Sequence, residues 1–483
     1  MRVVRTLALV LFALGLLWLG GPAAACTTIL VGKEASAERC VLIAHNEDDD
    51  PPQLVVHTKV PRTRHAAGDT LRIPEGPTLA QVPETWAFLW TDLPGCDFSQ
   101  SGLNEWGVCV TSDNCPSREE HADLVHGGIG PTLRRLIIER ARTARDGVRL
   151  AGRLVERFGY QAPGRTYVIG DPEEAWLLSI VRGHHWLAWR VPDDEVCVLE
   201  NSYVVRRVDL ADTNHVMASA DLVEYAVKRG WYDPQRDGPL DFARVFADSL
   251  VARHPANVGR QWAGLRRFTA VEPDLGPDLP ASVKPARPVG LADLMTALRD
   301  HYEGTELAHP QAETGDPHPG APGTVCARST QGSFVAQLRR GDRPEVDLVY
   351  WASLGRPCTS CFVPFHYGIG SFPSGWETPG AERPDAGTWR AWSEAPFRAD
   401  EGRAYATAVS FQGRVEGSYA ARIGAVRREL DAVEARALAL QPSVEEEARA
   451  LWSRDPAAAG TRLREFARET YRSALEAMSR ALP

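Results

Sequence analysis

Short runs of apolar and β-branched residues recur along the chain and restrict it to a fold that contains extensive β-sheet. The first two, at 27–32 and 40–48, are separated by a polar, turn-like stretch and predict a β-hairpin whose second strand ends in acidic residues. Further runs of this kind lie at 54–60, 86–90 and 107–113, and four follow one another between 166 and 205. The last two lie at 333–338 and 345–353.

Helical periodicity interrupts these runs. Apolar residues three and four positions apart predict helix across 127–159, and similar patterns predict helices over 241–255 and 291–304. The last hundred residues are rich in Ala, Arg and Glu and also predict helix. Strand clusters on both sides of helices are typical of a layered α+β domain with two sheets.

The amino terminus has the pattern of a secretory signal peptide. Arg2 and Arg5 precede an apolar run of about 13 residues, which ends shortly before Ala23-Ala24-Ala25. The run is shorter than the roughly 20 residues that span a bilayer, which disfavours an uncleaved anchor. Cleavage after Ala25 would make Cys26 the first residue of the mature chain. Lipidation of Cys26 is the competing possibility, but position −3 holds Ala23 rather than Leu.

Composition limits the kinds of partner and cofactor that can be expected for this chain. The formal net charge is −9 and no long basic block occurs, so nucleic acid is not an expected partner. Nine cysteines in an exported chain allow disulfides, but the sequence does not choose their pairing. Cys358 and Cys361 form a C-x-x-C pair that is more consistent with a structural disulfide or buried thiols than with redox chemistry. No second Cys pair or spaced His pair accompanies them, so neither a metal nor a cofactor is expected.

An amino-terminal cysteine carries its own base. A free thiol has a pKa of about 8.5 and a free α-amine a pKa of about 7.7–8, so the amine of Cys26 can accept the proton of its own thiol. An acid near that amine would hold it in place and tune its pKa. Asp48, at the end of the neighbouring predicted strand, is the candidate.

Five segments resemble the C69 dipeptidases, which are N-terminal nucleophile hydrolases, and are similar in part to the penicillin V acylases and bile salt hydrolases. They are CTTILVGKEASAERCVLIAHNED, SGLNEWGVCVTSDN, YVIGDPEEAWLLSI, WLAWRVPDDEVCVLENSY and VYWASLGRPCTSCFVPFHYG, in chain order. The resemblance covers most of 26–370 and weakens beyond it. It implies a four-layer αββα sandwich over 26–370, preceded by a signal peptide at 1–25. Residues 371–483 would then be a loop and a mainly helical extension packed on that domain.

The resemblance also implies roles for individual residues. Cys26 would be the nucleophile through its sulfur and the base through its amine, and Asp48 would bind the amine. Asn201 and Asn114 would stabilise the oxyanion, and Arg267 would match an arginine near the nucleophile. Structural roles compete with each of these: a turn cap for Asp48, strand-end turns for the two asparagines and a surface salt bridge for Arg267.

One position departs from the pattern of the family. The related motif usually reads Arg-Asn-x-Asp, whereas this chain has His45-Asn46-Glu47-Asp48. A histidine titrates near a pH of about 6.5, so the charge beside Cys26 and the substrate preference are both in question. Asn46 is expected to brace the turn.

The sequence thus predicts an exported cysteine-nucleophile amide hydrolase that cleaves dipeptides through a thioester, in the periplasm or outside the cell. Its partners would be small peptides, with no nucleic acid, no stable membrane association and a possible homo-oligomer. Two alternatives stay open: an acylase acting on N-acyl amides, and a catalytically silent lipoprotein or binding module.

Overall fold

The computed structural model describes residues 26–49, 55–73, 76–93, 101–308, 315–318, 323–377 and 403–482. The predicted signal peptide, Cys96 and residues 378–402 of the predicted loop and extension lie outside these residues. Within the described ranges, no helix has the length and apolar character needed to cross a membrane.

Cys26 directly precedes a central strand of the first sheet, which has seven antiparallel strands. Their order is β16 (Ser282–Val283), β14 (Val196–Leu199), β1 (Thr27–Val31), β2 (Val41–Asp48), β17 (Thr330–Leu338), β18 (Leu348–Leu354) and β19 (Val363–His366). The predicted hairpin is confirmed, because β1 and β2 pair from Thr27 with Asn46 to Val31 with Leu42. The β14 strand closes the other side of β1. The start of β1 is therefore surrounded by the ends of its neighbours.

The second sheet has eight antiparallel strands. Their order is β15 (Val216–Ala218), β13 (Trp186–Arg190), β12 (Ala175–Gly183), β11 (Tyr160–Gly170), β10 (Cys109–Asn114), β9 (Ser101–Asn104), β8 (Phe88–Asp92) and β3 (Val56–Val60). Two small ribbons extend from it, β4 (Thr63–Arg64) with β7 (Glu84–Thr85), and β5 (Thr70–Arg72) with β6 (Thr78–Ala80).

The two sheets pack face to face around a shared apolar core. A Cβ atom added to Gly170 in β11 would lie 2.7 Å from Cδ1 of Ile43 in β2, so the absent side chain permits this close approach. Val168 and Leu177 of the second sheet share one buried cluster with the strands of the first. Successive residues point to opposite faces of a strand, so Ile169 and Leu178 pack instead against helices.

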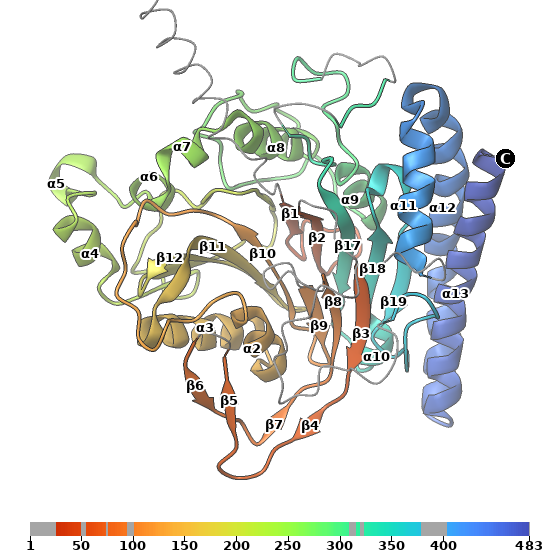
Figure 1. The fold of residues 1–483 in the computed structure, drawn as a ribbon, viewed down its shortest axis with the longest axis horizontal. Coiled ribbons are helices and arrows are strands. Elements are labelled where there is room, and N and C mark those ends of the chain that lie inside the picture. Colours follow the sequence, from red (N-terminus) through yellow and green to blue (C-terminus); the bar gives the residue numbers. More distant parts are fainter. Residues whose placement is uncertain are drawn as a thin grey trace, which may run out of the picture.

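Two helices, α2 (Leu133–Arg140) and α3 (Ala144–Phe158), cover the other face of the second sheet (Figure 1). The sequence predicts helix throughout 127–159, but the structure divides it. Thr143 is extended and its side chain accepts a 3.1 Å hydrogen bond from the amide of Asp146, which starts a new helix.

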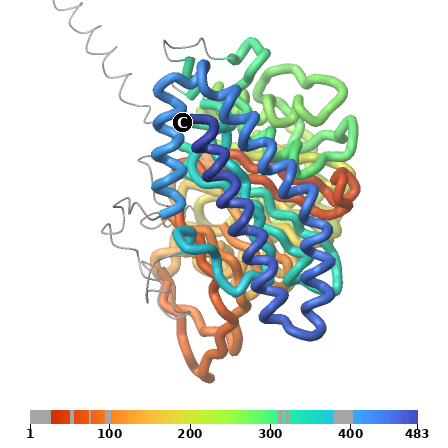
Figure 2. The backbone as a smooth tube through the Cα atoms, turned by 90° about the vertical axis from the view of Figure 1, so that its right-hand side faces the viewer, coloured from red at the N-terminus to blue at the C-terminus, as the bar shows by residue number. Residues whose placement is uncertain are grey.

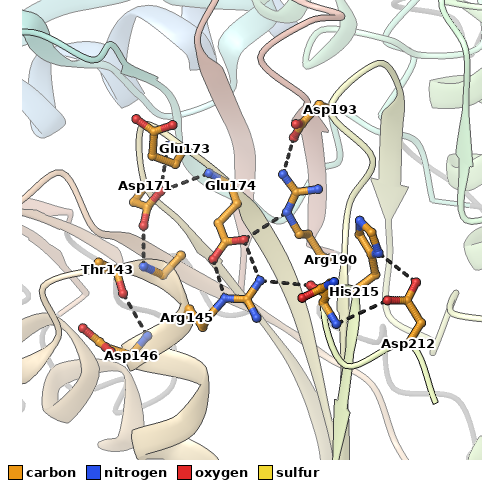
Figure 3. Close-up of polar contacts among 12 residues, drawn as sticks. Thr143, Arg145, Asp146, Asp171, Glu173, Glu174, Arg190, Asp193, Asp212 and His215 are labelled. Carbon is orange, nitrogen blue, oxygen red and sulfur yellow. Dashed lines mark hydrogen bonds and ion pairs between the residues drawn. The ribbon is translucent and has the colours of Figure 1, made fainter. Parts of the chain in front are cut away.

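Charged residues fix α3 to the ends of the second sheet (Figure 3). Glu174, in the turn between β11 and β12, accepts hydrogen bonds from Arg145 of α3 and Arg190 of β13. Asp171 in the same turn accepts a 2.6 Å hydrogen bond from the amide of Ala144 at the start of α3. The turn thereby holds the helix and two strands in one arrangement.

Helices also pack on the first sheet. Helix α8 (Pro255–Arg266) lies against β14, and α9 (Leu291–Ala297) lies near β2 and β17. The carboxyl-terminal helices α11 (Ala404–Glu416), α12 (Tyr419–Trp452) and α13 (Pro456–Ala481) lie side by side next to β18 and β19 (Figures 1 and 2). The predicted helical carboxyl terminus and the α+β class are therefore both observed.

The remaining helices are short. They are α4 (Leu222–Lys228), α5 (Pro234–Asp237), α6 (Phe242–Phe246), α7 (Ser249–Ala252), α10 (Pro344–Asp347) and a 3₁₀ turn at Pro357–Thr359. The single helix predicted over 241–255 is wrong in detail, because Asp248 caps a new helix within it. Pro255 then begins α8, since proline fits the first turn, where its missing N–H is not needed.

Candidate active site

The thiol of Cys26 is buried among acidic groups. Its residue is 5% exposed, and Sγ lies 3.4 Å from Oε1 of Glu47 and 3.7 Å from the carbonyl oxygen of Asp48. Burial raises the pKa of this thiol well above its usual value, and the charges of Glu47, Asp113 and Asp48 raise it further. Sulfur at this position is therefore protonated at neutral pH unless a base or a cation joins it.

Asp48 ends β2 and places a buried carboxyl beside Cys26. Neither carboxylate oxygen makes a hydrogen bond of normal geometry within the described part of the chain. Burial raises the pKa of Asp48 to about 8, although Thr330 and Arg260 act in the opposite direction. A buried carboxylate of this kind is stabilised most by an adjacent positive charge.

A chain of hydrogen bonds crosses from the first sheet to the second. The hydroxyl of Thr28 donates to Oδ2 of Asp113 in β10 at 2.6 Å and lies 2.7 Å from Nδ1 of His45. Because that hydroxyl has a single proton, Nδ1 of His45 has to be the donor to Thr28. The other ring nitrogen, Nε2, then faces Oε2 of Glu47 at 3.2 Å.

The neighbouring groups determine the charge that His45 carries beside Cys26. Burial lowers its pKa, but the hydrogen bond with Glu47 and the charge of Asp113 outweigh burial, and the net pKa is raised. Burial also raises the pKa of Asp113, to about 6. The acidic neighbours thus favour a charged imidazolium where the family motif usually carries arginine.

Arg260 of α8 holds the backbone at Cys26. Its Nη1 donates to the carbonyl oxygen of Cys26, and its Nη2 donates to Oδ1 of Asn201 at 2.9 Å and to Oδ1 of Asn257 at 2.7 Å. The Asn201 amide is fixed by its oxygen, while its buried Nδ2 has no hydrogen-bond partner among the described residues. A fixed, unused donor of this kind suits an oxyanion hole.

The other predicted site residues take different positions. The guanidinium of Arg267 pairs with Asp300, whereas Arg260 donates to the carbonyl oxygen of Cys26 and Arg165 lies near its thiol. Asn114 ends β10, is partly buried and pairs in register with Arg165. Asn46 is fully buried and braces the sheet rather than the substrate.

The contacts of Asn46 are specific. Its Nδ2 donates to the carbonyl oxygens of Leu298 at 2.9 Å and Val325 at 2.7 Å, and its Oδ1 accepts from the hydroxyl of Ser333 at 2.6 Å. These bonds hold the end of β2, and hence Asp48, against β17 and the end of α9.

Sequence reasoning missed four residues of the site: Thr28, Glu47, Asp113 and Arg260. Glu47 directly precedes Asp48, and Asp113 directly precedes Asn114. Both could have been considered as candidates from the alternation of side chains along a strand. A helix that contains Arg260 could have been predicted from Pro255. Proline is typical of the first turn of a helix, whereas the prediction placed it at the end of one. The hydrogen bond from Thr28 to Asp113 depends on sheet packing and has no local signal.

A narrow cavity lies next to this cluster. His45 and Glu47 form part of its lining, and His57, Phe334 and Tyr350 supply aromatic surface. A separate, larger cleft borders Glu200 and Ser202 on either side of Asn201, but Cys26 does not line it. The thiol of Cys26 also lies within 4.8 Å of ligand atoms of His45 and Glu47, so the group has donors that could bind a soft cation.

Comparison with known proteins shows the family of this chain. The family model for peptidase family C69 matches residues 25–389. A probable dipeptidase of Salmonella dublin is 30% identical over 383 residues, covering 75% of this chain and 86% of the relative. A dipeptidase of Bifidobacterium longum is 27% identical and covers 72% of each chain.

Among solved structures, a mutant conjugated bile acid hydrolase of Clostridium perfringens matches 74% of this chain and 100% of its own, with 13% identity and a TM-score of 0.32. The family match over most of the chain defines the protein as a peptidase. More particularly, it belongs to peptidase family C69.

Proposed function

We propose that the mature protein is an exported dipeptidase in which Cys26 is the nucleophile and its α-amine is the base. The observation that carries this proposal is a buried thiol in contact with the backbone carbonyl oxygen of Asp48, whose own buried carboxylate lacks a normal hydrogen bond. Removal of residues 1–25 would create an ammonium group at this position. That cation is the partner that a buried carboxylate requires.

In the proposed reaction, the α-amine of Cys26 takes the thiol proton, and the sulfur forms a bond to the carbonyl carbon of the substrate. The oxyanion accepts a hydrogen bond from Nδ2 of Asn201. Asn114, at the end of β10 in the second sheet, is the second candidate donor. The C–N bond then breaks as the ammonium returns a proton to the leaving amine. Water, deprotonated by the same amine, hydrolyses the thioester and restores the thiol.

Dipeptides are the proposed substrates. The two relatives described are named as dipeptidase and probable dipeptidase. A substrate with two charged ends also suits a site where Glu47 and Asp113 lie close to His45 and Arg260. The narrow cavity beside His45 would admit one small side chain.

We also propose the finer architecture and its boundaries. The two facing sheets with helices against each of them are consistent with the αββα sandwich of N-terminal nucleophile hydrolases, over 26–370. Residues 371–483 would be an extension packed on that domain, as the contact between His366 of β19 and Glu445 of α12 suggests. Cleavage after Ala25 would release the product into the periplasm or the medium.

The decisive experiment compares two forms of one chain. A fusion co-expressed with a site-specific protease, so that cutting can precede folding, supplies a form that begins at Cys26, and a second fusion cut one residue earlier supplies a form that keeps Ala25. We expect dipeptide hydrolysis only from the first, since an amide nitrogen at Cys26 is not basic. Equal activity of both forms would refute the amine as the base.

A second comparison tests the nucleophile. Cys26→Ser should abolish hydrolysis, whereas Cys40→Ser should retain it, since Cys40 is not part of this cluster and the hydroxyl of Ser36 lies near its side chain. Dipeptides and N-acyl amino acids assayed side by side separate a dipeptidase from an acylase. Intact mass of the exported protein completes the test, because a diacylglyceryl adduct on Cys26 would support the lipoprotein alternative.

A further inference from the structure

Four buried side chains from four separate segments meet beneath the carboxyl-terminal helices, away from the cluster at Cys26. They are His301 after α9, His318, Cys326 before β17 and Cys358 in the 3₁₀ turn. None is more than 6% exposed. Their ligand atoms all lie within 4.8 Å of one another.

The spacing of these atoms matches tetrahedral coordination. Nε2 of His318 lies 3.1 Å from Nε2 of His301, 3.4 Å from Sγ of Cys358 and 3.8 Å from Sγ of Cys326. With Zn–N bonds of about 2.0 Å and Zn–S bonds of about 2.3 Å, the ligands of a tetrahedral zinc lie about 3.3 to 3.8 Å apart. The three distances therefore fit one zinc ion at the centre.

Carboxylates fix both histidine rings in the orientation that a metal requires. Nδ1 of His301 lies 2.7 Å from Oε1 of Glu303, and Nδ1 of His318 lies 2.5 Å from Oδ1 of Asp316. A carboxylate at Nδ1 places the proton there and directs the lone pair of Nε2 toward the metal. In neutral rings the two Nε2 lone pairs would face each other at 3.1 Å, an arrangement that a cation between them stabilises.

The surroundings favour a structural ion over a catalytic one. Tyr419 of α12 packs edge-on against the rings of both His301 and His318. Four protein ligands leave no open coordination position for water or substrate. An ion here would tie the segments before β17 and after β18 to the surface on which α12 rests.

We propose that His301, His318, Cys326 and Cys358 bind one zinc ion that stabilises the junction between the sheet and the carboxyl-terminal helices. The expectation that the chain has no metal site depended on the lack of a local C-x-x-C or H-x₃-H partner. The four ligands are far apart in the sequence, so only the fold brings them together.

Metal content of the full mature chain is the first test. It is measured by mass spectrometry in a Cys26→Ala background, which removes the thiol of the separate group formed with His45 and Glu47. We expect close to one zinc per chain, lost in Cys358→Ser. Cys361→Ser is the matched control, because Cys361 is also buried but its Sγ faces the carbonyl oxygen of Phe362.

Cobalt substitution tests the same site without altering its ligands, so it can be used if Cys358→Ser does not fold. Co²⁺ in the unaltered ligand set should show the thiolate charge-transfer and visible bands of a tetrahedral site. His318→Cys should retain the metal with a changed spectrum. The proposal is overturned by a chain without metal after refolding with zinc, by equal zinc loss in Cys361→Ser, or by a disulfide between Cys326 and Cys358.

Discussion

Charge balance governs the environment of Cys26. Glu47, Asp48 and Asp113 are buried there together with His45 and Arg260. In a chain that keeps Ala25, burial and the charges of these three carboxyls raise the pKa of the thiol. A free α-amine at Cys26 would pair with the carboxylate of Asp48 as an ammonium, and in its neutral form it would be the base that takes the thiol proton.

The pH dependence of stability should report the state of Asp48. Its folded pKa of about 8 exceeds the usual value of 3.8, so the folded chain holds an extra proton between these values. The stabilisation is complete below about pH 4 and is lost as pH rises through about 8. In the form that keeps Ala25, unfolding by urea should show this loss, with a slope of up to about 1.4 kcal/mol per pH unit.

Asp48→Asn removes the titrating group and should flatten that part of the profile. The form that begins at Cys26 should also show a smaller loss, because its ammonium stabilises the carboxylate. An unchanged slope in Asp48→Asn would show that another group is responsible.

Asn201 should act on the transition state. Asn201→Ala removes the free Nδ2 donor, and kcat should fall roughly a hundred- to a thousand-fold with little change in KM. Asn257→Ala is the control, because Asn257 also accepts from Arg260 but donates its own amide to Val251. Equal losses in both variants would mean that Asn201 only positions Arg260.

At the scale of elements, α8 places Arg260 because the helix lies unusually close to β14. A Cβ atom on Gly264 would lie 2.7 Å from Cγ1 of Val198. The absent side chain therefore sets the distance between helix and strand, and through it the reach of Arg260 to Cys26.

Gly264→Ala should push α8 away from β14. We expect a loss of about 1–3 kcal/mol in the free energy of unfolding together with reduced kcat/KM. Gly424→Ala in α12 is the matched control, since no atom lies within 4 Å of its added methyl group and alanine favours helix. A stable, fully active Gly264→Ala enzyme would contradict this account of α8.

Helix α12 is anchored to the first sheet through Glu445. This buried carboxylate accepts hydrogen bonds from Arg339 and from Gln441, and it lies 3.0 Å from Nε2 of His366. Burial raises its pKa, but the bonds from His366 and Arg339 outweigh burial and hold the pKa at about 2.

Glu445→Gln should lower the free energy of unfolding by about 3 kcal/mol at pH 7, because it leaves the partly buried guanidinium of Arg339 without its charged partner. A lowered pKa contributes stability above the usual value of 4.5 that disappears as pH falls through about 2. The difference from wild type should therefore shrink in acid. Glu447→Gln, whose side chain is 56% exposed, should change stability by less than about 0.5 kcal/mol.

For the whole molecule, the described cysteines are all free thiols, despite the predicted export. They are Cys26, Cys40, Cys109, Cys115, Cys197, Cys326, Cys358 and Cys361. Alkylation of the unreduced chain, denatured with a chelator, should label all eight. Peptide mapping locates the labels, and a disulfide at any of these positions would contradict the structure.

Local patterns predicted the β1–β2 hairpin, most strands and the helical carboxyl terminus, because alternation and periodicity are properties of neighbouring residues. They also indicated Cys26 and Asp48, and the resemblance to the C69 dipeptidases added Asn201. In the structure Cys26 contacts Asp48, and Arg260 bonds to both Cys26 and Asn201. Arg260 was missed because one helix was extended across the cap at Asp248. The hydrogen bond from Thr28 to Asp113 could not be predicted from the sequence, because it depends on how the two sheets pack against each other.

The burial of Cys26 has a consequence for timing. The bond between Ala25 and Cys26 adjoins a residue that is 5% exposed at the edge of a finished strand. A protease needs an extended, accessible segment on both sides of the bond, and the buried Cys26 does not offer one in the assembled sheet. Under the proposed maturation, the leader must be removed while the chain is still emerging, before β14 and β2 enclose β1. A molecule that folds before cleavage would remain an inactive precursor. The rate of cleavage relative to the rate of folding would therefore set the yield of active enzyme.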